Sequence, residues 1–166
     1  MQDAAGKNAL SAPFIEELMP ILEELKNNTS IKVVLMSGTS DIFCSGADME
    51  TLIKLCKKEI KPVDIILSKM ILDIPVPVIA AMEGHAIGGG LAIGACADIA
   101  ILGEESRYGC SFMNMGFTPG MGITKLLEHF MSPAMAQEMQ YTGNFYKGKS
   151  LIGKTNLNYI LPKAEV

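Results

Sequence analysis

The segment His85–Asp98, HAIGGGLAIGACAD, most strongly limits the folds that this chain can adopt. Its three consecutive glycines follow a short apolar run and precede small residues that suit a helix. Glycine adopts backbone conformations closed to other residues and lets a neighbouring segment approach closely. The segment therefore predicts a strand that ends in a tight turn and leads into a closely packed helix.

Known glycine motifs differ in what they require. A P-loop needs a lysine after its last glycine, and none follows Gly90. A dinucleotide-binding turn needs the spacing G-x-G-x-x-G, which these glycines do not have, although Glu104 and Glu105 stand near the right distance for a ribose partner. These two interpretations are set aside.

Two interpretations of the glycines remain open. They let a helix pack closely on a strand, or they leave backbone N–H groups facing a cavity at a helix start. Such donors suit a developing oxyanion. The turn Ser45–Asp48, with the sequence SGAD, offers a second helix start that supplies another donor.

Composition indicates one globular domain. The 166 residues are enough for a single domain, 1–166, with a sizeable core. The net charge of −4, with lysines scattered among glutamates, gives no basic face for nucleic acid or an anionic membrane. Asp73 and Asp98 interrupt the longest apolar stretches, which disfavours a membrane span. We expect a soluble cytoplasmic protein that binds neither nucleic acid nor membrane.

The cysteines show no C-x-x-C spacing, and only two histidines are present to complete a metal site. We therefore expect no metal and reduced, mostly packed thiols, as in a cytosolic protein. The four residues are Cys44, Cys56, Cys96 and Cys110.

Hydrophobic periodicity predicts alternating strands and helices, and hence an α/β fold with parallel pairing and right-handed crossovers. A helix is expected from the N-cap Ser11 through Leu25, with a kink at Pro20. The other expected helices are Met49–Leu55, Val63–Leu72, Gly122–Met131 and Pro133–Met139, the last of them with Ser132 as its N-cap. The expected strands are Ile31–Ser37, Ile74–Met82 and Asp98–Leu102, with a tight turn at Phe43–Asp48.

Three motifs in order resemble the crotonase (enoyl-CoA hydratase/isomerase) superfamily: FCSGAD at Phe43–Asp48, GHAIGGG at 84–90 and GFTPGMG at Gly116–Gly122. The resemblance covers nearly the whole chain. It implies a spiral of ββα units, a thioester substrate and an oxyanion hole made by two backbone N–H groups. Those donors match Ala47 and Gly89.

The two catalytic glutamates of the family's hydratases have no counterpart here. Their positions, two residues after the triple glycine and just before the G-x-x-P-G turn, hold Ala92 and Phe112. Neither residue can move a proton, so the resemblance makes water addition improbable. We place both residues, with His85 and Gly88, among those that bind the substrate, and expect His85 to be a hydrogen-bonded structural residue near the site.

An oxyanion hole without the usual acid and base suits decarboxylation, because loss of CO2 needs only a stabilised dienolate. The chain resembles in particular the decarboxylating enoyl-CoA hydratase homologues of polyketide β-branching cassettes. The matching residues are GHAIGGG, Ser111–Gly122, Ala136–Glu138 and Leu161–Val166. This resemblance implies a 3-methylglutaconyl-type substrate on the phosphopantetheine of an acyl carrier protein within a polyketide synthase assembly. The product is then a 3-methylcrotonyl-type thioester, and no further cofactor is implied.

The same group carries a catalytic lysine between two helices, in the segment that reads KKEIKP here. Lys61 is the best match, with Lys57 and Lys58 as alternates. The group's second catalytic residue is a histidine in C-terminal helices beyond Val166. His129 is expected to be an ordinary surface or packing residue.

The resemblance further implies that the chain lacks the first strands of the fold and the C-terminal helical part, which closes the site and builds a trimer. Two other functions stay open. One is an acyl-CoA dehydratase or isomerase whose base is among Asp48, Glu50 and Glu83. The other is a non-catalytic subunit that binds a thioester.

Overall fold

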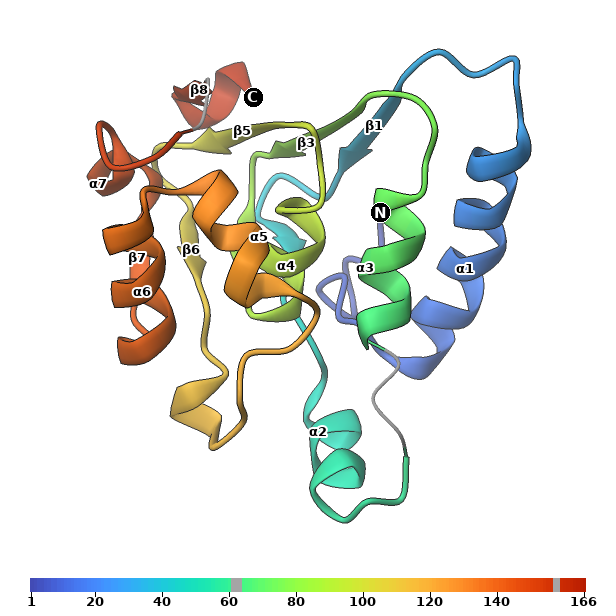
Figure 1. The fold of residues 1–166 in the computed structure, drawn as a ribbon, viewed down its shortest axis with the longest axis horizontal. Coiled ribbons are helices and arrows are strands. Elements are labelled where there is room, and N and C mark those ends of the chain that lie inside the picture. Colours follow the sequence, from blue (N-terminus) through green and yellow to red (C-terminus); the bar gives the residue numbers. More distant parts are fainter. Residues whose placement is uncertain (61–63, 157–158) are drawn as a thin grey trace.

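The computed structural model describes residues 1–60, 64–156 and 159–166. Within these residues the strands form two four-stranded sheets (Figure 1). The first sheet is parallel and has the order β1 (Val34–Ser37), β3 (Val78–Met82), β5 (Ile99–Gly103) and β8 (Tyr159–Leu161). The second has the order β2 (Ile42–Cys44), β4 (His85–Ile87), β6 (Arg107–Gly109) and β7 (Phe145–Lys147), and only β7 is antiparallel to its described neighbour.

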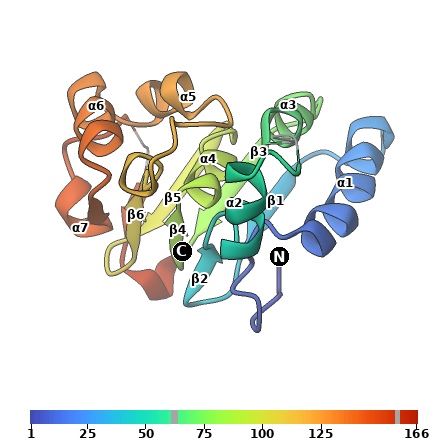
Figure 2. The same cartoon turned by 90° about the horizontal axis from the view of Figure 1, so that it is seen from below.

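The helices lie largely in a row, in the order of the chain. They are α1 (Ala12–Asn27), α2 (Met49–Cys56), α3 (Asp64–Leu72), α4 (Gly89–Gly94), α5 (Ile123–Phe130), α6 (Pro133–Thr142) and α7 (Gly148–Leu151). Contacts join α1 to α3, α3 to α4, α4 to α5 and α5 to α6. Figure 2 shows α1, α3, α5 and α6 along one side of the sheets. None of the helices in the described part of the chain is long and apolar enough to cross a membrane.

From β1 to β6, consecutive strands alternate between the two sheets. The chain places β1 and β2, then β3 and β4, then β5 and β6 in the first and second sheet in turn, and helices follow each pair. This arrangement confirms the predicted spiral of ββα units. Its consequence is that the turns after β2 and β4, far apart in the sequence, lie side by side.

Helices α1 and α6 begin after the serines that the sequence predicted as N-caps. Ser11 Oγ accepts a hydrogen bond from the Phe14 backbone N–H at 3.4 Å, and Ser132 Oγ accepts one from Met135 N–H at 3.4 Å. Both serines are N-caps, as predicted. Pro20 lies inside α1, which continues past it to Asn27.

The predicted strands Ile31–Ser37 and Ile74–Met82 were too long. Strand β1 begins at Val34 because its partner β3 begins at Val78, and these two residues are the first pair of the ladder. Pro75 and Pro77 precede β3 and have no N–H to donate to a ladder. Strands β1 and β3 therefore begin at the first residues where both can form the hydrogen bonds of the ladder.

Of the second sheet, the sequence predicted only the strand before the glycines, which is β4, and missed the other strands. Phe43–Asp48 was predicted to be a tight turn, but its first two residues belong to β2 and only the rest forms the turn. The described strands of this sheet have three residues each. Three residues show too little alternation to distinguish a strand from a loop.

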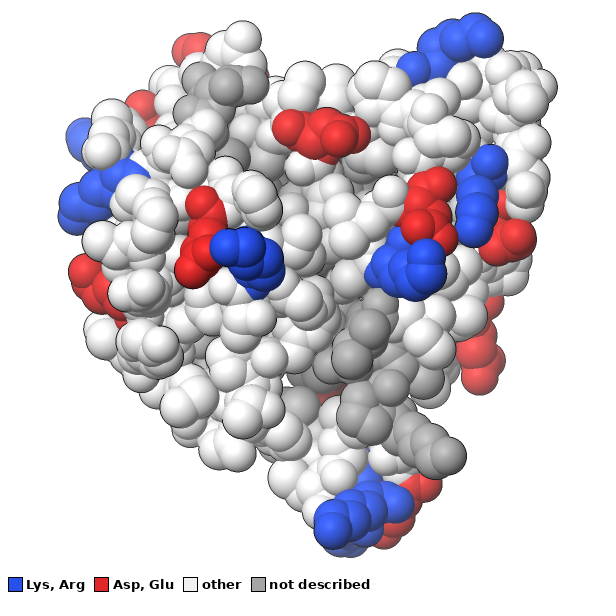
Figure 3. All heavy atoms as spheres, viewed as in Figure 1, with Lys and Arg blue, Asp and Glu red and all other residues white. Residues whose placement is uncertain are grey.

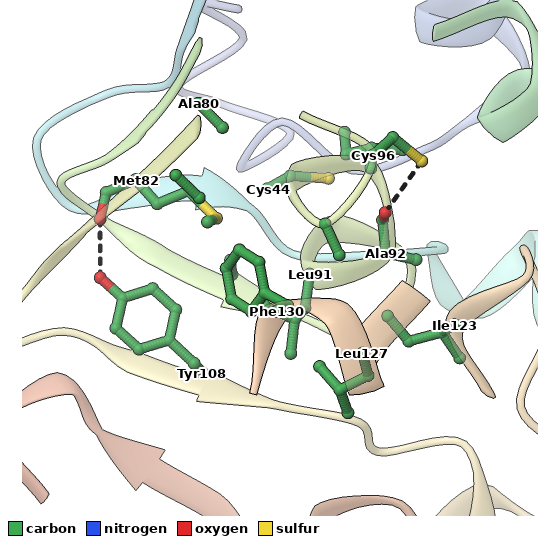
Figure 4. Close-up of a cluster of buried hydrophobic side chains, with 14 of the residues drawn as sticks. Cys44, Ala80, Met82, Leu91, Ala92, Cys96, Tyr108, Ile123, Leu127 and Phe130 are labelled. Carbon is green, nitrogen blue, oxygen red and sulfur yellow. Dashed lines mark hydrogen bonds between the residues drawn. The ribbon is translucent and has the colours of Figure 1, made fainter. Parts of the chain in front are cut away.

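A continuous hydrophobic core joins the sheets to α4 and α5, and Figure 4 shows part of it. Tyr108 of β6 is fully buried there. Its hydroxyl donates a hydrogen bond to the Met82 carbonyl at 2.6 Å and accepts one from Gly103 N–H at 2.8 Å. A side chain of the second sheet is thus fixed to two strands of the first.

Helix α4 lies against the backbone of β2 because Gly90 has no side chain. A Cβ on Gly90 would lie 2.1 Å from the Cys44 carbonyl oxygen and 2.7 Å from its carbonyl carbon, both backbone atoms. Such distances are far inside van der Waals contact, so any larger residue must push α4 away from β2.

We predict that Gly90→Ala lowers the free energy of unfolding by about 1 to 3 kcal/mol, the usual cost of overpacking. Gly89→Ala is the control, since its Cβ would meet mainly the ends of the Leu10 and Met121 side chains, at 2.9 and 3.0 Å. Urea denaturation of both variants measures the difference. Equal stabilities would show that α4 does not need this close contact.

Candidate active site

The SGAD turn connects β2 to α2 through a glycine that no other residue can replace without strain. Gly46 has φ +82°, and a Cβ on it would lie 2.7 Å from the Ile87 carbonyl oxygen. Asp48 is the N-cap of α2, and its carboxylate accepts hydrogen bonds from Thr51 N–H at 2.7 Å and from the Thr51 hydroxyl at 2.9 Å. Ala47 therefore lies between a constrained turn and a capped helix.

The triple glycine forms the matching turn between β4 and α4. Gly88 is the N-cap of α4 with φ +54°, and its N–H donates to the Gly109 carbonyl at 2.8 Å. Gly89 is the first residue of the helix, and Gly90 is the residue that touches β2. Gly88 and Gly90 thus have separate structural reasons to be glycine.

The two turns contact each other. A Cβ on Gly46 would lie 3.2 Å from the Gly89 backbone nitrogen, and a Cβ on Gly89 would lie 3.8 Å from the Gly46 Cα atom. The structure therefore brings together the two segments that hold Ala47 and Gly89, the predicted oxyanion-hole donors, from positions 42 residues apart in the sequence.

The carbonyl that precedes each donor is held by a hydrogen bond. Gly46 O accepts from Leu10 N–H at 2.8 Å, and Gly88 O accepts from Ala92 N–H at 3.1 Å. The peptide bonds are not cis, so each carbonyl points opposite to the N–H of the next residue. Holding the two carbonyls therefore fixes the directions of the Ala47 and Gly89 N–H groups. No oxygen of the described residues accepts a hydrogen bond from either group.

Neither of the positions expected to carry a hydratase glutamate can supply an acid or a base. Ala92 is fully buried in α4, and its carbonyl accepts a hydrogen bond from Cys96 Sγ at 3.3 Å (Figure 4). Phe112 is partly buried against the core, immediately before a short 3-10 helix at Met113–Met115. The side chains at these two positions are therefore apolar.

His85 lies at the opposite end of β4 from Gly88. Its Nδ1 accepts a hydrogen bond from the Arg107 backbone N–H at 2.9 Å. The backbone N–H of His85 donates to the Asp41 carbonyl at 2.9 Å. Burial lowers the pKa of His85, and the charges of Lys163 and Arg107 lower it further. The structure therefore separates His85 from Ala47 and Gly89 and gives it a structural hydrogen bond.

The acids near the motifs are occupied or lie elsewhere. Asp48 caps α2, Glu50 pairs with Lys54 at 2.6 Å between Oε1 and Nζ, and Glu83 precedes β4 at the end away from Gly88. His129 is an exposed residue in the last turn of α5. Asp48 and Glu50 are thus engaged in hydrogen bonds of their own, and Glu83 lies at the far end of β4.

The candidate lysines follow α2. Lys57 is its C-cap, with Nζ 4.0 Å from Glu59 Oε1, and Lys58 adopts a left-handed conformation with φ +59°. Lys61 lies outside the described residues. Helix α2 projects from the sheets in Figure 1, all eight of its residues are at least partly exposed, and Figure 3 shows acidic and basic atoms mixed at this end of the molecule.

An open cavity of about 510 Å³ between the N-terminal segment and the start of α2 was not foreseen. Its polar lining comes from Ser11, the residue before α1, and from Asp48, Glu50, Thr51 and Lys54. Asp48, Thr51 and Lys54 recur every three residues, which places them on one side of α2 and is a signal that the sequence did contain.

The thiols take no part in the chemistry that this site offers. Burial raises the pKa of Cys44 and Cys110 to about 12 and that of Cys96 to about 11, so these thiols stay protonated at neutral pH. These three cysteines are buried, Cys56 is exposed, and all four are free, in agreement with the expected packed thiols.

Comparison with known sequences places the site in a family. The profile of the enoyl-CoA hydratase/isomerase family matches residues 1–166. The chain is 39% identical over 166 residues to the bacillaene synthase decarboxylase PksI of Bacillus subtilis, and the match covers all of this chain and 67% of the relative. It therefore spans about two thirds of that protein.

Solved structures agree with this assignment. A structure from a study of a dehydratase/decarboxylase enzyme couple in polyketide beta-branching matches with a TM-score of 0.94 at 39% identity, covering all of this chain and 68% of that one. The ECH2 decarboxylase domain of CurF from Lyngbya majuscula matches with a TM-score of 0.91 at 36% identity and the same coverage. The chain belongs to the enoyl-CoA hydratase/isomerase family.

Proposed function

We propose that the protein decarboxylates a 3-methylglutaconyl-type thioester carried by an acyl carrier protein, giving a 3-methylcrotonyl-type thioester. The observation that carries this proposal is the pairing of two directed backbone N–H groups with apolar residues where hydratases have glutamates. The likeness to decarboxylases of polyketide biosynthesis supports the same reaction.

In this reaction the bond between the carboxylate carbon and its neighbour breaks, and CO2 leaves. The electron pair enters the conjugated system and forms a dienolate, whose negative charge collects on the thioester oxygen. The N–H groups of Ala47 and Gly89 then stabilise that oxygen by hydrogen bonds that strengthen as the charge develops. A proton added to the far carbon of the dienolate completes the product, so no base is needed to start the reaction.

Hydration requires an acid and a base that the two hydratase positions of this chain do not supply. Water addition requires one group to activate water and another to protonate the adjacent carbon. The positions of Ala92 and Phe112 hold no ionisable side chain.

Incubation with 3-methylglutaconyl thioester on a carrier protein, followed by mass spectrometry of the product, distinguishes the possible functions. Loss of CO2 supports the proposal. Gain or loss of water contradicts it, and an unchanged mass favours a subunit that only binds thioesters.

The remaining parts of the proposal follow from the family resemblance. Lys61 orients the departing carboxylate and returns the proton, the phosphopantetheine of the carrier protein holds the substrate, and the enzyme needs no cofactor of its own. We further propose a cytoplasmic protein that works with a polyketide synthase as a homotrimer. The free cysteines suit such a reducing compartment.

We predict that Gly89→Pro reduces the rate of CO2 release about 10²- to 10³-fold, the usual effect of removing one oxyanion-hole donor. Proline is accepted at the first position of a helix, so α4 can persist without this N–H. Gly89→Ala keeps the N–H and is the matched control. Similar rates in the two variants, measured in single turnovers, would rule out a role for the Gly89 donor.

We predict that Ala92→Glu combined with Phe112→Glu does not create an efficient hydratase. Acid and base must be placed within about an ångström of their productive positions, and Ala92 is packed in the core with no room for a longer side chain. Hydration of an enoyl thioester is measured for the variant and the unmodified protein. Efficient hydration by the unmodified protein would contradict the proposed decarboxylation.

We predict that Lys61→Ala slows decarboxylation about a hundredfold or more, in line with the effect of a positioned acid, while carrier-protein affinity changes little. Lys57→Ala and Lys58→Ala are the controls and should have smaller effects. The measurement is single-turnover CO2 release, with folding of each variant checked by circular dichroism. Near-normal release by Lys61→Ala would remove this residue from the mechanism.

A further inference from the structure

We infer that Asn8 is a positioning residue that sets the direction of the Ala47 N–H through the loop Lys7–Leu10. The inference rests on the proposed oxyanion hole. Asn8 is fully buried although it is polar. A buried amide is stable only when its hydrogen-bonding groups are satisfied, so the partners of this side chain define its role.

The Asn8 side chain joins the N-terminal segment to the end of β2. Its Nδ2 donates to the carbonyls of Ile42 at 3.1 Å and Phe43 at 3.0 Å, and also to Met1 O at 3.3 Å. Its Oδ1 accepts from Asp3 N–H at 2.7 Å. Both the nitrogen and the oxygen of the amide thus have partners, and two of its bonds go to the strand that leads into the SGAD turn.

The backbone of the loop is held in an uncommon conformation. Lys7 and Asn8 both have positive φ, +56° and +49°. Asparagine tolerates this left-handed region better than most residues, whereas lysine seldom adopts it. Two consecutive residues in this region persist because surrounding contacts hold them, and the Asn8 amide supplies such contacts.

The loop in turn holds the SGAD turn. Ser45 N–H donates to the Lys7 carbonyl at 3.3 Å, and Leu10 N–H donates to the Gly46 carbonyl at 2.8 Å. The second bond acts on the peptide that also contains the Ala47 N–H, and a planar trans peptide turns as one unit. Displacement of the loop therefore rotates the donor.

Leu10 also contacts the other half of the site. A Cβ on Gly89 would lie 2.9 Å from Leu10 Cδ1. The backbone of Leu10 thus holds the peptide of one donor, while its side chain packs against the residue that provides the other. Asn8, two residues before Leu10, anchors the loop that makes both contacts.

The test compares Asn8→Asp with Asn156→Asp. The first keeps the shape of the side chain but removes the donors to Ile42 and Phe43. The second removes the same kind of donor, which bonds Met131 O at 3.2 Å in another part of the fold. We expect Asn8→Asp to lower kcat for CO2 release about tenfold to a hundredfold, as for a misdirected catalytic group, with little change in KM. Asn156→Asp should leave both constants near normal.

A spectroscopic measurement separates positioning from a loss of stability. The probe is 3-methylcrotonyl pantetheine labelled with ¹³C at the thioester carbonyl, whose infrared stretching frequency falls when hydrogen bonds polarise it. We expect a large fall on binding to the unmodified protein and to Asn156→Asp, and a clearly smaller fall with Asn8→Asp at saturating probe. An equal fall in all three proteins overturns the inference.

Should Asn8→Asp fail to fold, replacement of Leu10 by its α-hydroxy acid removes only the N–H that holds Gly46 O. The matched control is the same replacement at Ile15, whose N–H donates to Ser11 O at 2.9 Å. A reduced carbonyl shift for the Leu10 ester alone supports the inference, and equal shifts contradict it. Absence of CO2 release by the unmodified protein, with the carbonyl shifts as expected, would instead contradict the proposed reaction and leave the role of Asn8 standing.

Discussion

The close contact between α4 and the end of β2 is the constraint on which the site depends. It exists because Gly90 presents no side chain to the Cys44 carbonyl, and it brings the turn after β4 against the turn after β2. Gly46 extends the contact, since its Cα lies beside Gly89 and its left-handed conformation leaves no room for a side chain facing Ile87. Packing and catalysis are therefore not alternative explanations of the glycine segment. The same backbone approach that packs the helix also brings together the two turns that carry the Ala47 and Gly89 amide groups.

Hydrogen bonds to the preceding carbonyls convert this contact into directed donors. A peptide group on a surface turn can rotate and lose its alignment with a charge, whereas a peptide whose carbonyl is held has already given up that freedom. Gly88 O is held by the first turn of α4, and Gly46 O is held by Leu10 from a different segment. Electrostatic stabilisation of a transition state is effective when the dipoles are oriented before the charge appears. The site meets this condition through backbone geometry without an ionised side chain from the described residues.

The sequence predicted the parts of the fold that have a local cause. Ser11 and Ser132 cap helices as expected, whereas the strand predicted from Ile74 begins only at Val78, after the two prolines. The other three-residue strands of the second sheet, apart from β4 before the glycines, could not be predicted, because their stability comes from neighbouring strands rather than from their own pattern. Ala47 and Gly89 were proposed from motifs, and the contact between their turns depends on the spiral. Asn8 was not singled out because its partners Ile42 and Phe43 are more than thirty residues away and are carbonyls of the backbone, which leave no mark in a side-chain pattern.

Apolar residues at the two hydratase positions change which reactions the same oxyanion hole favours. A carboxylate close to the thioester would repel the negative charge of a dienolate and that of a substrate carboxylate, and this repulsion is strong where water is excluded. In the proposed site, Ala92 and Phe112 would bring neither repulsion. The replacement thus does more than abolish acid–base catalysis of hydration. It makes the site tolerant of a substrate that brings its own carboxylate, and it lets the carbon–carbon bond that holds this carboxylate be the one that breaks.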